Sequence, residues 1–118
     1  MAILRIVPNF KSESPQKSRE FYHDFLGMDI GMDMDWIITF VSPENPKAQV
    51  SIINEDPMAH IHPDCSIEVK EIKQLHARAV EFGLKILYPL TDEPWGVRRF
   101  FVSDPNGKVV NLMQHISD

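Results

Sequence analysis

Residues 18–28 read Ser-Arg-Glu-Phe-Tyr-His-Asp-Phe-Leu-Gly-Met, and the rest of the fold can be worked out from this stretch. Its aromatic and leucine residues recur at helical spacing and form one apolar stripe, after which Gly27 supplies a helix stop. Ser14 and Pro15 have the features of a helix N-terminus, because serine can accept a backbone N–H and proline has none to lose. We therefore predict a helix over 15–26, preceded by a strand over 3–8.

The end of this helix recurs in the second half of the chain. Residues 27–30 (Gly-Met-Asp-Ile) align with residues 83–86 (Gly-Leu-Lys-Ile) at a shift of 56, and Val41-Ser42 aligns with Val102-Ser103 at a shift of 61. Further strands are predicted over 28–34, 36–41 and 48–54 in the first half, and over 65–69, 85–89, 97–103 and 108–115 in the second, where a helix covers 71–82.

The repeat predicts one α+β domain built from two βαβββ modules. Module one covers residues 1–54, a connecting loop covers 55–63, and module two covers 64–118. Each module is too small to bury its own sheet face alone. We therefore expect the strands to curl into a cup-shaped, barrel-like mixed sheet with the helices outside.

Composition and charge exclude several classes of function. The chain has 118 residues, 43% of them hydrophobic, and 12 Lys and Arg against 17 Asp and Glu give a net charge of −5. An acidic balance does not attract phosphate backbones or anionic lipids, so we expect neither nucleic acid nor membrane as a partner. Cys65 is the single cysteine and cannot close an intrachain disulfide, and no apolar leader opens the chain. These features predict a cytoplasmic protein.

Four segments together resemble the vicinal oxygen chelate superfamily, which includes glyoxalase I, the bleomycin-resistance proteins, fosfomycin-resistance enzymes and extradiol dioxygenases. They are residues 18–28, Phe82-Gly83, residues 94–98 (Pro-Trp-Gly-Val-Arg) and residues 100–107 (Phe-Phe-Val-Ser-Asp-Pro-Asn-Gly). The resemblance covers nearly the entire chain. It implies paired modules, a homodimer, and a small ligand bound inside the cup.

The resemblance also implies where a metal ion would be held. Metal enzymes of this superfamily place four His, Gln or Glu ligands on the first and last strands of each module, and the corresponding positions here are Val7, Ser51, Asp64 and Asn111. Of these side chains only that of Asp64 binds divalent cations strongly, whereas first-row metals need several imidazole, carboxylate or thiolate donors. We therefore predict a metal-free cup and no cofactor.

A different metal set remains open in the connecting loop. If residues 60–64 were extended, His60, His62 and Asp64 would lie on one face and supply three donors. The alternative is an exposed connecting loop, because Pro57 and Pro63 bracket the segment.

The ligand wall is predicted from the last two strands. If the turn at 104–107 pairs Ser103 with Lys108, strand alternation places Arg98, Phe100 and Val102 beside Val109, Asn111 and Met113. Trp95 offers a flat apolar surface and Arg98 a fixed charge nearby. In the competing interpretation Trp95 plugs the sheet edge or a dimer seam and Arg98 pairs with an acidic residue.

The leading hypothesis is a dimer of the bleomycin-resistance-like branch that binds or sequesters a planar, cationic or anionic small molecule without a metal, as in antibiotic resistance. The predicted ligand-binding residues are Val7, Trp36, Phe40, Ser51, Asp64, Trp95, Arg98, Phe100, Asn111 and Met113. One alternative is a lyase, isomerase or dioxygenase that uses zinc, nickel, iron or manganese, held by His60, His62 and Asp64 or by ligands from across a dimer. Another is a non-catalytic module that binds a partner protein.

Overall fold

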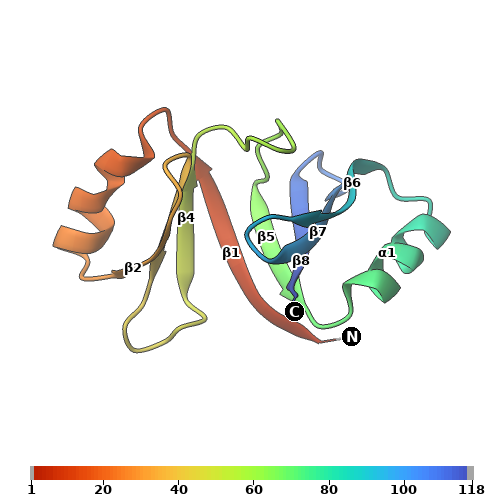
Figure 1. Ribbon diagram of the computed structural model, residues 1–118, viewed down its shortest axis with the longest axis horizontal. Helices are drawn as coiled ribbons and strands as arrows, with labels where there is room; N and C mark the ends of the chain where they lie inside the picture. The colour runs from red at the N-terminus through yellow and green to blue at the C-terminus, as the bar shows by residue number, and fades with distance from the viewer. Residues whose placement is uncertain (1, 117–118) are drawn as a thin grey trace. The chain divides into compact units, whose positions relative to one another are not determined.

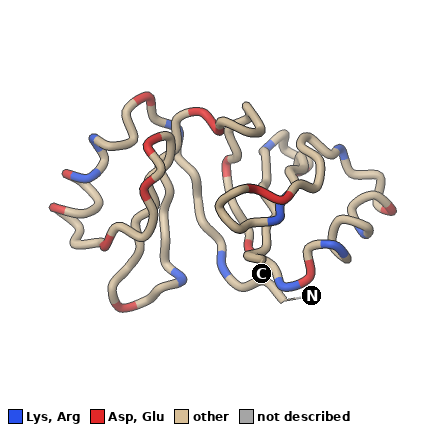
Figure 2. Tube along the Cα trace, viewed as in Figure 1, with Lys and Arg blue, Asp and Glu red and all other residues tan. Residues whose placement is uncertain are grey.

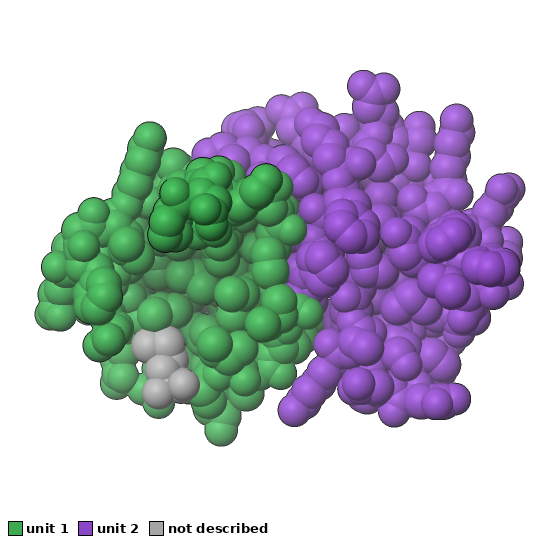
Figure 3. All heavy atoms as spheres, turned by 180° about the vertical axis from the view of Figure 1, so that it is seen from behind, with its two compact units in different colours: residues 1–6, 63–118 green, residues 7–62 purple. Residues whose placement is uncertain are grey.

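The computed structural model describes residues 2–116, and the chain divides into two compact units (Figures 1 and 3). Unit 1 contains residues 1–6 and 63–118, and unit 2 contains residues 7–62. Strand β1 (Ile3–Lys11) contributes to both. Its first half belongs with the C-terminal residues, where the N–H of Lys70 donates to the carbonyl of Ala2 over 3.2 Å. The repeat in the sequence predicts these first residues as part of the N-terminal module, residues 1–54.

Unit 2 contains strands β2 (Asp29–Asp33), β3 (Ile37–Val41) and β4 (Gln49–Ile53), which pair in the order β2-β3-β4-β1. Strand β1 runs parallel to β4, and the other pairs are antiparallel. Alternate side chains of β3 and β4 form the buried core, which consists of Ile38, Phe40, Val50 and Ile52. Tyr22 packs against this core with its ring centroid 5.1 Å from that of Phe40.

The helix predicted over 15–26 is not one α-helix. It consists of a 3-10 turn, η1 (Pro15–Ser18), and a π-helix, η2 (Glu20–Phe25). The side chain of Ser14 does not cap it, and the N–H of Leu26 donates five residues back to the carbonyl of Phe21. The predicted apolar stripe is only partly buried, since Phe21 and Phe25 are 52% and 73% exposed. Pro15 is the buried residue of this segment, and Tyr22 is the residue of the predicted stripe that packs against the core of unit 2.

Unit 1 contains strands β5 (Cys65–Val69), β6 (Ile86–Glu93), β7 (Val97–Ser103) and β8 (Val109–His115), which pair in the order β1-β5-β8-β7-β6. Helix α1 (Ile72–Glu81) packs on one face of these strands. The core between helix and strands consists of Val69, Ile72, Ala79, Phe100 and Val102. Gly83 follows the helix with a φ of 70°, a left-handed conformation that glycine adopts without strain.

The internal repeat reappears in the strand pairing. Asn9 pairs with Ser51 across β1 and β4, and Ser66 pairs with Asn111 across β5 and β8. These pairs are related by shifts of 57 and 60 residues, the shifts that relate Val7 to Asp64 and Ser51 to Asn111. The strands and helices confirm the predicted α+β class, while the closure of the sheet into a cup stays a prediction.

One part of the repeat was aligned incorrectly. Thr39 lies opposite Ser51, and Phe101 lies opposite Asn111, so β3 and β7 are related by a shift of 62 rather than 61. Successive side chains of a strand point to opposite faces, so a difference of one residue exchanges the two faces of β7. Phe100 and Val102 therefore face α1, and not the predicted cup.

Charged residues of both signs are interspersed along the trace of each unit (Figure 2). Within residues 2–116, every helix is too short or too polar to cross a bilayer.

Candidate functional site

The candidate site lies on the face of unit 1 opposite α1. Val69, Phe100 and Val102 pack toward the helix, so their neighbours along each strand point the other way. The side chains on this opposite face come from β5, β8 and β7: Ser66, Glu68, Asn111, Met113, Arg99 and Phe101. We call them the sheet-face residues.

The predicted register of β7 and β8 is wrong by one residue. Ser103 pairs with Val109, not with Lys108. The turn is one residue longer than expected, because Asp104 Oδ1 accepts the backbone N–H groups of both Asn106 and Lys108. Phe100, predicted to line the cup, is therefore fully buried beneath α1.

Arg98 also lies on the helix side of β7 and does not accompany Trp95. Its Nε and Nη2 donate to the two carboxylate oxygens of Asp92 over 2.5 and 2.9 Å. This bonding holds the pKa of Asp92 below its ordinary value and raises the pKa of Arg98. Arg98 thus has the ion-pair role that the competing interpretation gave it.

The arginine beside Trp95 is Arg99, which the sequence analysis missed. Its guanidinium lies 5.2, 5.0 and 4.9 Å from the ring centroids of Tyr88, Trp95 and Phe101. Its Nε donates to Glu93 Oε2 over 2.7 Å, and the Tyr88 hydroxyl donates to the same oxygen over 3.0 Å. The Arg99 and Glu93 side chains are only 4% and 1% exposed. An aromatic cage of this kind stabilises a desolvated cation, and here the protein's own arginine fills it.

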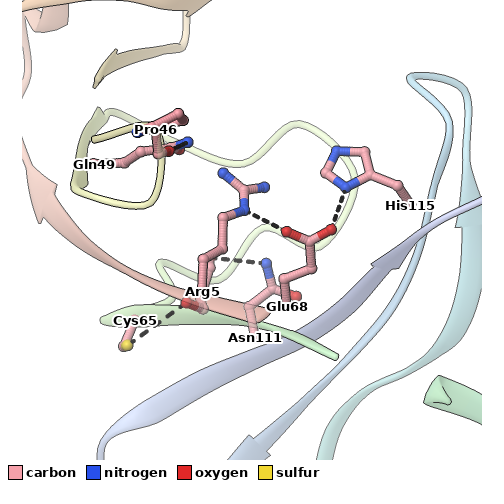
Figure 4. A network of polar contacts seen from close by, with 8 residues as sticks. Arg5, Pro46, Gln49, Cys65, Glu68, Asn111 and His115 are labelled. Carbon is pink, nitrogen blue, oxygen red and sulfur yellow. Dashed lines mark hydrogen bonds and ion pairs between the residues drawn. The ribbon is translucent and has the colours of Figure 1, made fainter. Parts of the chain in front are cut away.

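A second cluster of charged side chains is centred on Glu68. Its carboxylate lies between Arg5 and His115 (Figure 4). Arg5 Nε donates to Oε1 over 2.6 Å, and His115 Nδ1 lies 2.9 Å from Oε2. Burial raises the pKa of Glu68, but hydrogen bonds from His115 and Arg5, together with the Arg5 charge, outweigh it and hold the pKa below its ordinary value. The carboxylate is thus an internally paired anion.

Asn111 occupies the middle of the sheet-face residues and has an unsatisfied atom. Its Nδ2 donates to Ser66 Oγ over 3.0 Å. The residue is 8% exposed, and its Oδ1 is buried with no hydrogen-bond partner among residues 2–116. Buried acceptors are rarely left unpaired, so this oxygen is a candidate contact for a ligand donor.

The equivalent row in unit 2 is satisfied and packed. Ser51 Oγ and Thr39 Oγ1 are 2.7 Å apart, and both residues are buried. Val7 is also buried, and Trp36 is half-buried just before β3. Phe40, predicted as a wall residue, instead stacks on Tyr22 in the core on the other side of β3.

The four positions implied as metal ligands do not fit a divalent cation. Val7 has no donor atom, and Ser51 and Asn111 are neutral. Asp64 is the one carboxylate, and its Oδ2 accepts the backbone N–H of Val109 over 2.8 Å. One carboxylate with neutral oxygen donors does not supply the ligand field that first-row metals require.

The connecting loop does not form the alternative set either. His60 has a φ of 56°, which interrupts the extended conformation needed to align it with His62 and Asp64. Its Nδ1 lies 3.6 Å from Glu55 Oε1 on the surface. Across residues 2–116, no group of three or more His, Cys, Asp and Glu side chains is placed to hold a metal ion.

Solved structures share the fold at low sequence identity. NAD-dependent benzaldehyde dehydrogenase from Legionella pneumophila matches with a TM-score of 0.75 and 18% identity over 93% of this chain and 98% of the other. A glyoxalase/bleomycin resistance protein/dioxygenase superfamily member from Vibrio splendidus gives 0.68 and 17% over 96% and 99%. Methylmalonyl-CoA epimerase from Streptomyces coelicolor, as a variant in complex with 2-nitronate-propionyl-CoA, gives 0.73 and 13% over 98% and 100%. No curated protein matches the chain significantly.

The family assignment comes from a family model. The model of the Glyoxalase/Bleomycin resistance protein/Dioxygenase superfamily matches residues 12–112, which include most of both βαβββ repeats. The match confirms the resemblance found in the sequence, and the chain belongs to this superfamily.

Proposed function

We propose that this protein binds a small molecule, without a metal ion, on the face of unit 1 opposite α1. The observation that carries the proposal is the buried, unpartnered Oδ1 of Asn111. Leaving a buried acceptor unsatisfied costs about 1–3 kcal/mol. A ligand that donates a hydrogen bond to this oxygen would recover that free energy.

Asn111 is surrounded by buried apolar side chains, so a ligand reaches it only when the residues that cover this face move aside. Phe101 lies directly opposite on β7, and Met113 is the next residue on the same face of β8. Ligand sites are commonly built from apolar and aromatic side chains around a few fixed polar groups. Trp95 extends the apolar surface through its contact with Arg99.

Binding is favoured over metal-dependent catalysis because the positions implied as metal ligands lack the donors for it. Polarisation of substrate oxygens by a metal, as in a lyase, isomerase or dioxygenase, requires a cation held by several strong ligands. Val7, Ser51 and Asn111 supply none of these. Sequestration of an antibiotic, dimerisation, and ligand contacts by Val7, Trp36 and Ser51 remain predictions.

Chemical-shift mapping tests this proposal. Phenol is titrated at millimolar concentration into isotopically labelled, untagged protein in the presence of a chelator. We expect saturable shifts at Asn111, Phe101 and Met113, and none at exposed positions such as Asn106. No saturable shifts, or shifts confined to unit 2, would overturn the proposal.

A further inference from the structure

We propose that Asn106 is a site of spontaneous deamidation, that isoaspartate is one of the products, and that the hydrogen bonds of Asp104 limit the rate. The site lies in the turn between β7 and β8, residues 104–107 (Asp-Pro-Asn-Gly). It is independent of the proposed binding of a small molecule, because it concerns the backbone of this turn and not the sheet-face residues.

The reaction needs an asparagine amide and the backbone nitrogen of the next residue. The nitrogen of Gly107 loses its proton and attacks Cγ of Asn106, so that an N–C bond forms, the Cγ–Nδ2 bond breaks, and ammonia leaves with that proton. Water then adds to one of the two carbonyls of the resulting succinimide ring and opens it. One direction of opening gives aspartate and the other gives isoaspartate. No atom is oxidised or reduced, and water is the co-reactant.

Asn106 meets both requirements of this reaction, which are an accessible amide and an unhindered nitrogen in the next residue. Asn106 and Gly107 are both exposed. Gly107 has no side chain to obstruct the attack, and even an added Cβ at this position would meet no atom within 4 Å. The backbone nitrogen of Gly107 can therefore approach the Asn106 amide once the turn opens.

The other four asparagines of the chain each lack one of these requirements. Asn9 and Asn111 are buried within strands. Asn45 is exposed but precedes a proline, whose nitrogen has no proton to lose. Asn54 precedes a glutamate, whose side chain hinders the approach of the nitrogen and whose negative charge opposes the loss of its proton. Deamidation is thus expected at one position.

Asp104 opposes the reaction while the turn is folded. Its carbonyl accepts the N–H of Gly107 over 3.1 Å, so the attacking nitrogen has to give up this bond before it loses its proton. Its Oδ1 accepts the backbone N–H groups of Asn106 and Lys108 over 2.8 and 2.9 Å, which fixes the chain on both sides of the reacting bond. The turn must open locally before Asn106 reacts, so the rate follows the fraction of open turns.

The two products should affect the fold differently. Isoaspartate adds one carbon atom to the main chain of a turn that is closed by the N–H of Asp104 donating to the carbonyl of Lys108 over 2.9 Å. This bond lies beside the first pair of the β7–β8 ladder, Ser103 with Val109. A longer main chain does not fit this closure, whereas aspartate keeps the chain length and adds only a charge. Isoaspartate should therefore lower the urea midpoint more than Asn106→Asp does.

Ageing of the purified protein tests the proposal. Native wild-type protein and the same chain in urea are kept in mildly alkaline buffer for several weeks, and their peptides are analysed by mass spectrometry. We expect the native protein to gain mass at Asn106 and at no other asparagine, more slowly than the unfolded chain. An isoaspartate methyltransferase should label the same peptide. Asn106→Ser keeps a small polar residue in the turn and is the matched control, which should not be labelled.

Substitutions at Asp104 show whether its bonds limit the rate. Asp104→Ala removes the side-chain acceptor and should accelerate deamidation of the native protein about tenfold, the factor that one charge-assisted hydrogen bond supplies. Asp104→Asn keeps an acceptor oxygen and should age at nearly the wild-type rate. Phe100→Leu weakens the core under α1 and leaves the turn unchanged, so it measures any acceleration that comes from global unfolding.

The proposal is wrong if native wild-type protein gains no mass at Asn106 while the chain in urea does, or if aspartate is the sole product. Equal rates in the native and unfolded protein would contradict the restraint by the turn. The same conclusion would follow if Asp104→Ala aged no faster than wild type or than Phe100→Leu. A urea midpoint of the isoaspartate form equal to that of Asn106→Asp would contradict the expected effect on the β7–β8 ladder.

Discussion

Ser51 and Asn111 occupy equivalent positions in the two halves of the repeat, yet only Ser51 has a fully satisfied side chain. Its hydroxyl lies 2.7 Å from that of Thr39. Asn111 uses its nitrogen on Ser66 and keeps a buried oxygen without a partner in the described chain, residues 2–116. The two halves have thus diverged at this position, and the proposed binding face lies in the half that contains Asn111.

Arg99→Met is expected to lower the free energy of unfolding by about 3–5 kcal/mol, because it leaves the Glu93 carboxylate buried without its ion partner. The matched control is the neighbouring Arg98→Met, which removes only an exposed pair with Asp92 and should have a much smaller effect. Urea unfolding of both variants measures the difference. Equal losses of unfolding free energy in the two variants would mean that the buried Arg99–Glu93 pair stabilises the fold no more than the exposed Arg98–Asp92 pair.

Glu68 is expected to make stability depend on pH. Its folded pKa lies below the ordinary value of 4.5, so its stabilising contribution is present above that value and is lost as the pH falls through the lowered folded pKa. Glu68→Gln should make the free energy of unfolding less dependent on pH in this acidic range. Its dependence on pH near neutrality should change little. Denaturant midpoints of both proteins, measured in steps below pH 5, provide the check, and parallel profiles would contradict it.

Phe100 and Phe101 should separate stability from binding, although both are fully buried. Phe100 packs under α1 and Phe101 faces Asn111. Phe100→Ala is expected to lower the free energy of unfolding by about 3–5 kcal/mol. Phe101→Leu should weaken phenol binding, whereas Phe100→Leu should not. Titration of phenol into the two leucine variants is the check. Weaker binding in Phe100→Leu but not in Phe101→Leu would contradict the observed pairing of Phe101 with Asn111 and support the register predicted from the sequence.

The sequence was sufficient for the order of elements and for the repeat. Glycines at the helix ends and alternating apolar residues are local signals, and they located the strands of both halves. The sequence did not show which side chains of β7 face α1, because this depends on whether the side chain of Asp104 lengthens the turn by one residue. Arg99 and Glu93 were missed for the same reason, since a one-residue slip places Arg98 beside Trp95.

Other features depended on contacts distant in sequence. The residues around Gly27 looked like the end of an ordinary helix, yet η2 has wider turns, and Tyr22 packs on Phe40 of β3. The unsatisfied oxygen of Asn111 is likewise invisible in the sequence. The bonding of the Asn111 side chain depends on Ser66, which is 45 residues away along the chain.

Metal independence is the central claim, and a calorimetric titration of phenol into untagged, chelator-stripped protein tests it most directly. The titration is run before and after addition of one equivalent of zinc and, separately, of manganese. The account predicts a single site with the same affinity in all three cases. Phenol binding that is detectable only after a metal is added would contradict it.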